Sequence, residues 1–166
     1  MNLYKKYMST KKHIVIYSHG FGVRKDDNGL LSDIAEHLPE VESIRYLLER
    51  YDIEDPVKEN TVGVFSNQTF SDLYTNLVAK GQESLVSALI VGTTIEDLDI
   101  KDLNDLSATV DNQDILEIYA NLNRGSRNHL RSFSKQLAKQ GETYSAQYLT
   151  QEEINNILNS RQEKGQ

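Results

Sequence analysis

VGTTIEDLDIKDL (residues 91–103) and NRGSRNHLRSF (residues 123–133) are the stretches that decide the fold that this sequence predicts. They lie inside two longer runs, about 83–110 and 112–139, in which apolar residues recur three and four positions apart. An α-helix turns about 100° per residue, so residues at this spacing lie on one face. The two runs therefore predict a pair of long helices, each with an apolar face that packs against a neighbour.

Two carboxylates interrupt the apolar face of the first run. Glu96 and Asp99 share that face, whereas Asp97 is expected to point outward. The apolar residues of this face are Leu85, Ala88, Leu89, Gly92, Ile95, Leu103, Leu106 and Val110. A buried carboxylate is unfavourable unless it is paired, hydrogen-bonded or bound to a metal. The pattern leaves two interpretations open, a salt bridge to a neighbouring helix and a ligand in the core of a helix bundle.

A histidine occupies the apolar face of the second run. His129 follows Leu122 by seven positions and precedes Phe133 by four, so all three share one face. The residues expected to face outward are Arg124, Asn128 and Arg131. A single histidine on an apolar face is usually a hydrogen-bonded core residue. A carboxylate on the facing helix makes metal ligation the alternative.

Flanking segments add shorter elements. Residues 69–81 predict an amphipathic helix that Ser71 caps and Gly81 ends. Thr150 and Glu153 have the spacing of a capping box, which predicts a last helix to about Asn159.

Much of the chain resembles a known family. From about residue 45 to residue 158 it is similar to a ferritin-like domain family of uncharacterised function that occurs in prokaryotes. The resemblance rests on YLLERYDIEDPV (46–57), IEDLDIKDL (95–103), GSRNHLRSF (125–133) and YSAQYLTQEEINNIL (144–158). It implies a mainly α fold, an incomplete antiparallel bundle of three to four core helices, and a di-iron or di-manganese carboxylate site.

The resemblance also implies metal ligands. By the ferritin-like pattern, Glu96 is the carboxylate of the third core helix and His129 is the histidine of the fourth. Asp99 is then either a ligand or an acceptor that orients the histidine. His37 and Glu40 fall where the second helix of such bundles carries a glutamate and a histidine, but in reversed order. They are either a remnant of the site or a coincidence.

The beginning of the chain has a different character. HIVIYS (13–18) predicts a short buried strand. Residues 1–12 are polar and basic and suggest at most a helical turn, so this strand lacks an obvious partner. Residues 30–38 predict a helix that Pro39 ends or kinks.

Residues 13–44 resemble the first strand, loop and helix of an α/β-hydrolase, with HGFG (19–22) as the loop. That fold needs a G-x-S-x-G nucleophile elbow, and the chain contains none. We therefore expect no hydrolase activity and assign no catalytic residue. The change of resemblance near residues 41–46 suggests a fusion of a hydrolase-like fragment (1–44) to a ferritin-like domain (45–160), followed by a disordered tail (161–166).

Composition restricts the partners. The formal net charge of −7 argues against nucleic acid and against an anionic membrane surface. No cysteine is present, which excludes disulfides and thiolate ligands. No apolar run approaches the roughly 18 residues of a membrane span. A cytoplasmic location is the expectation.

These observations favour a ferritin-like protein of unestablished activity with an incomplete metal site, either mononuclear or empty. Iron or manganese is the metal that such a site would bind, in a metal-handling or oxidoreductase class, and the sequence does not identify a substrate. The alternative is a non-catalytic helical interaction domain without metal. Replacement of the first bundle helix would expose apolar surface on the third and fourth. The sequence therefore predicts a homo-oligomer, a dimer in which a second chain covers that surface.

Overall fold

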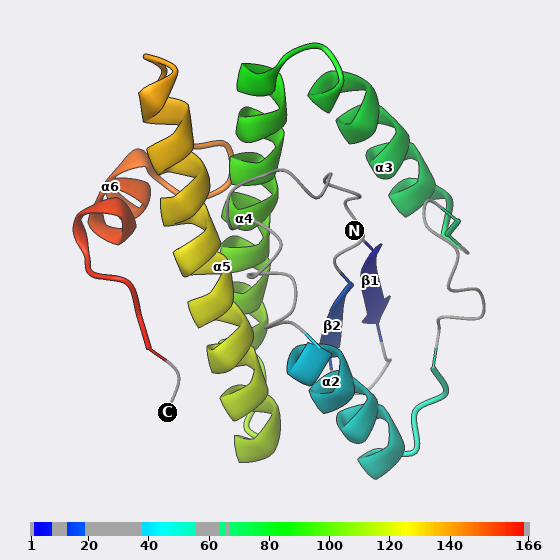
Figure 1. Cartoon of the computed structure of the whole chain (residues 1–166). Coiled ribbons are helices and arrows are strands. Elements are labelled where there is room, and N and C mark those ends of the chain that lie inside the picture. The colour runs from blue at the N-terminus through cyan, green and yellow to red at the C-terminus, as the bar shows by residue number, and fades with distance from the viewer. Residues whose placement is uncertain (1, 8–12, 19–37, 56–63, 66, 165–166) are drawn as a thin grey trace. The chain divides into compact units, whose positions relative to one another are not determined.

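The computed structural model describes residues 2–7, 13–18, 38–55, 64–65 and 67–164, with side chains from residue 43 onward. Its described part is mainly helical (Figure 1). The chain divides into two compact units, Met1–Thr75 and Asn76–Gln166. Among the described residues, no helix has both the length and the apolar composition that crossing a membrane requires.

The first unit contains two strands, β1 (Asn2–Tyr7) and β2 (His13–Ser18). They pair antiparallel in a two-stranded sheet, with Asn2 opposite Ser18 and Tyr7 opposite His13. No strand was expected over residues 2–7. Lysines interrupt this segment, so its composition resembles an exposed loop more than a strand.

Helix α2 (Leu38–Arg50) follows. Pro39 lies in the first turn of this helix. A proline fits there because the first N–H groups of a helix have no partner within the helix. The helix expected over 30–38 lies outside the described residues up to residue 37. The buried side chains of α2, at helical spacing, are Ile44, Leu47 and Leu48.

Helix α3 (Gln68–Gly81) ends at the expected glycine but begins earlier than the sequence suggested. The Asn67 side-chain oxygen accepts a hydrogen bond from the Thr69 backbone N–H at 2.9 Å. The Ser71 N–H donates to the Asn67 carbonyl, so Ser71 is already inside the helix. Asn67 therefore caps α3, and the assignment of Ser71 as the cap was wrong.

The predicted pair of long helices is confirmed in the second unit. Helix α4 covers Leu85–Ser107 and α5 covers Gln113–Lys139, and the two lie side by side with opposite directions (Figure 1). The hydroxyl of Ser84 caps α4 by accepting from the Ser87 N–H at 3.0 Å. The hydrophobic residues of this pair that are most deeply buried are Leu103, Ile115, Tyr119, Leu130 and Leu137.

One close contact sets the spacing of these helices. A Cβ atom added at Gly92 of α4 would lie 2.8 to 2.9 Å from three ring atoms of Phe133 of α5. Real Cβ atoms essentially never approach other atoms so closely, so the ring needs a residue without a side chain at position 92.

The last helix, α6 (Gln151–Asn159), has the predicted capping box. The Thr150 hydroxyl accepts from the Glu153 N–H, and the Glu153 carboxylate accepts from the Thr150 N–H. Gly141, at a φ of 80°, ends α5 and starts the connection to α6. A hydrophobic cluster joins the three helices and this connection, through Leu89, Ile100, Leu130, Leu137, Tyr144, Leu149 and Ile154.

Candidate functional site

The carboxylate of Glu96 and the imidazole of His129 meet between α4 and α5. Glu96 Oε1 lies 3.4 Å from His129 Nδ1. The Glu96 side chain is 3% exposed and the His129 side chain 14%, so bulk water reaches neither freely. The interior of the helix pair thus holds an acid and a base in direct contact. The sequence pattern placed both residues on facing apolar surfaces, and the structure brings them together.

A second carboxylate is buried one helical turn from Glu96. Asp99 is only 1% exposed. Burial, followed by the negative charges of Glu96 and Asp102, raises the pKa of Asp99 well above its ordinary value. Two acids so close together in a low-dielectric interior favour either protonation of one of them or a compensating cation.

The described part of the chain contains no group of three or more His, Asp or Glu side chains arranged to hold a metal ion. Glu96 and His129 therefore form a pair of donors rather than a complete coordination shell. Glu40 lies in the first turn of α2, where side chains are not described, and His37 lies outside the described residues. Their assignment as ligands stays a prediction.

Asp97 corrects a prediction, because it is fully buried and does not point outward. Its carboxylate organises the connection between α5 and α6 by accepting four hydrogen bonds. These come from the Tyr144 hydroxyl at 2.8 Å and from the backbone N–H groups of Gln147 at 2.7 Å, Tyr148 at 3.1 Å and Leu149 at 2.8 Å. Burial, more than the Asp97 charge, raises the pKa of Tyr144, so this phenol stays a donor.

The sequence missed the role of Asp97 for a physical reason. Asp97 is turned by about 100° from Glu96, away from the face that packs on α5. The segment that covers Asp97 is an irregular loop, and hydrophobic periodicity does not show which helix face a loop will cover. The available signal was the run IEDLD itself, which has acids on adjacent faces of an otherwise apolar helix.

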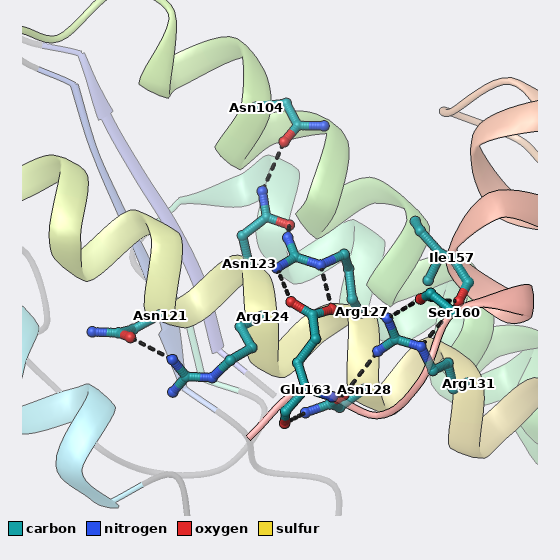
Figure 2. Close-up of polar contacts among 10 residues, drawn as sticks. All are labelled: Asn104, Asn121, Asn123, Arg124, Arg127, Asn128, Arg131, Ile157, Ser160 and Glu163. Atoms are coloured by element: carbon teal, nitrogen blue, oxygen red, sulfur yellow. Dashed lines mark hydrogen bonds and ion pairs between the residues drawn. The ribbon is translucent and has the colours of Figure 1, made fainter. Parts of the chain in front are cut away.

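A second face of the GSRNHLR motif (residues 125–131) forms hydrogen bonds with residues that follow α6 (Figure 2). Arg127 and Arg131 both donate to the Glu163 carboxylate, and Asn128 bonds to the Glu163 backbone. Asn128 and Arg131 were expected to face outward. Residues 161–164 were expected to be disordered, but Glu163 is held by charge-assisted hydrogen bonds.

A buried asparagine links this face to α4. The Asn123 amide donates to the Asn104 side-chain oxygen at 2.7 Å, and its oxygen accepts from Arg127 at 2.7 Å (Figure 2). This amide joins the two helices without adding charge.

Comparisons with known proteins identify relatives of this chain. The chain matches the family described as "Uncharacterized protein domain (DUF2202)" over residues 28–161. It is 50% identical over 125 residues to the uncharacterized protein MJ0754 of Methanocaldococcus jannaschii, an alignment that covers 75% of this chain and 68% of that protein. The crystal structure of the hypothetical protein MJ0754 from Methanococcus jannaschii matches with a TM-score of 0.77 and 46% identity. This match covers 80% of this chain and 76% of that one.

The family match begins at residue 28, so it includes residues 28–44, part of the stretch that resembles a hydrolase. The junction suggested near residues 41–46 therefore lies inside the matched span. The proposed domain boundary stays a prediction.

Proposed function

The chain belongs to the DUF2202 family, whose function is uncharacterised, and we propose that it is a ferritin-like protein that binds iron or manganese through Glu96 and His129. The observation that carries this proposal is the contact between a buried carboxylate and an imidazole on facing helices. Bundles of the ferritin-like type place their metal ligands at this position, projecting inward from adjacent helices.

The distance between the two donors suits a shared metal ion. Carboxylate oxygens and imidazole nitrogens bind first-row metals at about 2.1 Å, so two ligands of one ion lie roughly 3.0–3.4 Å apart. Glu96 Oε1 and His129 Nδ1 are separated by 3.4 Å. Imidazole suits iron and carboxylates suit manganese, which agrees with the chemical types of these donors.

Asp99 provides the additional negative charge that a divalent cation would neutralise. Its burial next to Glu96 is unfavourable for the ionised acid, and a bound cation offsets this cost. The remaining ligands would come from outside the described side chains, and the sequence suggests Glu40 and His37. When bound, such a metal would supply reactivity toward oxygen or peroxide, or a place for iron in transit.

One observation favours a second function. The described residues hold no three-membered ligand group, and Asp97 is fully engaged in holding a loop. A helical interaction domain without metal is consistent with that arrangement. In this case Glu96 and His129 would form an internal acid–base pair with a structural role.

Metal analysis decides between the two functions. The parent protein, produced in medium supplemented with iron or manganese, is compared with Glu96→Gln and His129→Gln by elemental mass spectrometry. We expect the parent to retain metal and both variants to lose it, because each variant replaces a strong ligand, the carboxylate or the imidazole, with a neutral and weakly binding amide of similar size.

Asp105→Asn is the matched control. Asp105 is an exposed carboxylate on the same helix, paired with Lys101, so its loss should leave the metal content unchanged. Circular dichroism verifies that all variants are helical. Absence of metal from the folded parent protein would refute metal binding and support the interaction domain.

A further inference from the structure

The strongest polar cluster apart from Glu96 and His129 is the contact between α5 and residues 160–164. Asn128 pairs with the backbone of Glu163 in both directions. Its amide donates to the Glu163 carbonyl at 2.9 Å, and its oxygen accepts from the Glu163 N–H at 3.0 Å. A side-chain amide bonded in this way recognises the backbone of one extended residue, because it offers the same donor and acceptor as a neighbouring strand.

Two guanidinium groups bind the side-chain carboxylate of Glu163. Arg127 forms a two-point contact with the Glu163 carboxylate, with Nε at 2.8 Å from Oε1 and Nη2 on Oε2. Arg131 Nη2 adds a contact to Oε1 at 2.8 Å. The bonds from Arg127, and then from Arg131, hold the pKa of Glu163 at about 2. A charged carboxylate is therefore the group that this cluster recognises.

Other residues hold both arginines in place. Asn123, which donates a hydrogen bond to Asn104 of α4, accepts one from Arg127 Nη1 and so fixes the orientation of Arg127. Arg131 donates to the Asn128 oxygen, the Ile157 carbonyl and the Ser160 hydroxyl. Figure 2 shows Arg127, Asn128 and Arg131 grouped around Glu163. The contacts of the two arginines with Asn123, Asn128 and Ile157 do not involve residues 160–164, so they persist when a different carboxylate occupies the position.

We propose that Arg127, Asn128 and Arg131 form a docking site for an extended peptide that carries a glutamate, occupied in this chain by its own residues 160–164. An acidic segment of a partner protein binds there when these residues leave. The backbone pairing by Asn128 accepts any residue, and the two arginines demand a carboxylate. This site lies on α5 but is separate from the Glu96–His129 pair.

The test adds the segment as a free ligand to the full-length chain. Glu163→Gln removes the charge of the internal occupant and keeps its size. The isotope-labelled variant is titrated with the peptide NSRQEK (residues 159–164) and followed by NMR. We expect saturable shifts of the Asn128 side-chain amide and of the amides around it. The wild-type chain should need about tenfold more peptide, because its own segment competes at high effective concentration.

Three controls separate recognition from general charge attraction. The peptide NSRQQK, with glutamine in place of the glutamate, should bind about tenfold more weakly or not at all, because it lacks the charge. Arg127→Gln in the Glu163→Gln chain should abolish the shifts. Arg124→Gln in that chain should not, because Arg124 contacts Asn121 and takes no part in the cluster.

Two outcomes would overturn the proposal. One is equal binding of the two peptides, which would show that the site does not recognise the glutamate carboxylate. The other is an absence of shifts at Asn128 at millimolar peptide. If Glu163→Gln does not fold, the wild-type titration, in which the free peptide displaces the internal segment, gives the same decision.

Discussion

At the scale of single residues, Asp97 is the most heavily used acid in the second unit. One carboxylate satisfies the Tyr144 hydroxyl and three successive backbone N–H groups, so the loop before α6 depends on it. Buried donors that lose their acceptor cost about 1–3 kcal/mol each. The carboxylate of Asp97 thus has a structural role.

We predict that Asp97→Asn destabilises the protein by about 3 kcal/mol or more. Asparagine keeps one acceptor oxygen but turns an NH₂ group toward donors that now need an acceptor. Chemical denaturation measures the change. Asp105→Asn, on the exposed side of α4, should alter the free energy of unfolding by no more than about 0.5 kcal/mol. Similar values for the two variants would contradict the structural role of Asp97.

The candidate site illustrates what residue patterns can predict. The positions of Glu96 and His129 followed from helical spacing, because both lie on faces that pack helix against helix. Asp97 and Asn128 could not be found in this way, because their partners are loop or terminal segments that carry no periodicity. The contacts of Glu163 depend on where the chain turns after α6, which no local pattern encodes.

At the scale of elements, α4 and α5 hold the second unit together, and the Phe133 ring of α5 lies where a side chain at Gly92 of α4 would stand. Glycine inside a helix costs about 1 kcal/mol relative to alanine. The chain accepts this cost because the Phe133 ring occupies the volume of the missing side chain. Packing therefore overrides helix propensity at this position.

We predict that Gly92→Ala lowers stability by about 1–3 kcal/mol, because displacement of the ring outweighs the gain in helix propensity. Thermal denaturation measures the effect. The double variant Gly92→Ala, Phe133→Leu should recover part of the loss, since a smaller side chain leaves room for the methyl group. A stabilised single variant would show that the ring moves without cost.

Element boundaries were predictable where capping chemistry is local. Thr150 and Glu153 started α6 as expected, and glycines ended α3 and α5. Ser71 was misleading because serine is common at helix caps and also inside the first turn, so its position alone does not fix the boundary.

At the scale of the whole molecule, the alignment to the Methanocaldococcus protein leaves about a third of that protein without an aligned counterpart, since it covers 68% of its length. In a helix bundle, each helix covers apolar surface of its neighbours. The dimer expected from the sequence covers the apolar surface that replacement of a first bundle helix would expose.

We predict a homodimer in which the second copy covers this surface, because large exposed apolar patches are uncommon on monomers. Light scattering after size-exclusion chromatography should give twice the chain mass of 18.9 kDa at micromolar concentration. The melting temperature should rise with protein concentration, because association stabilises the folded chain by mass action.

Glu163→Gln is a suitable control, since it alters an intrachain contact of the second unit and should leave the mass unchanged. A clean monomer whose melting temperature does not depend on concentration would mean that this chain completes its own core.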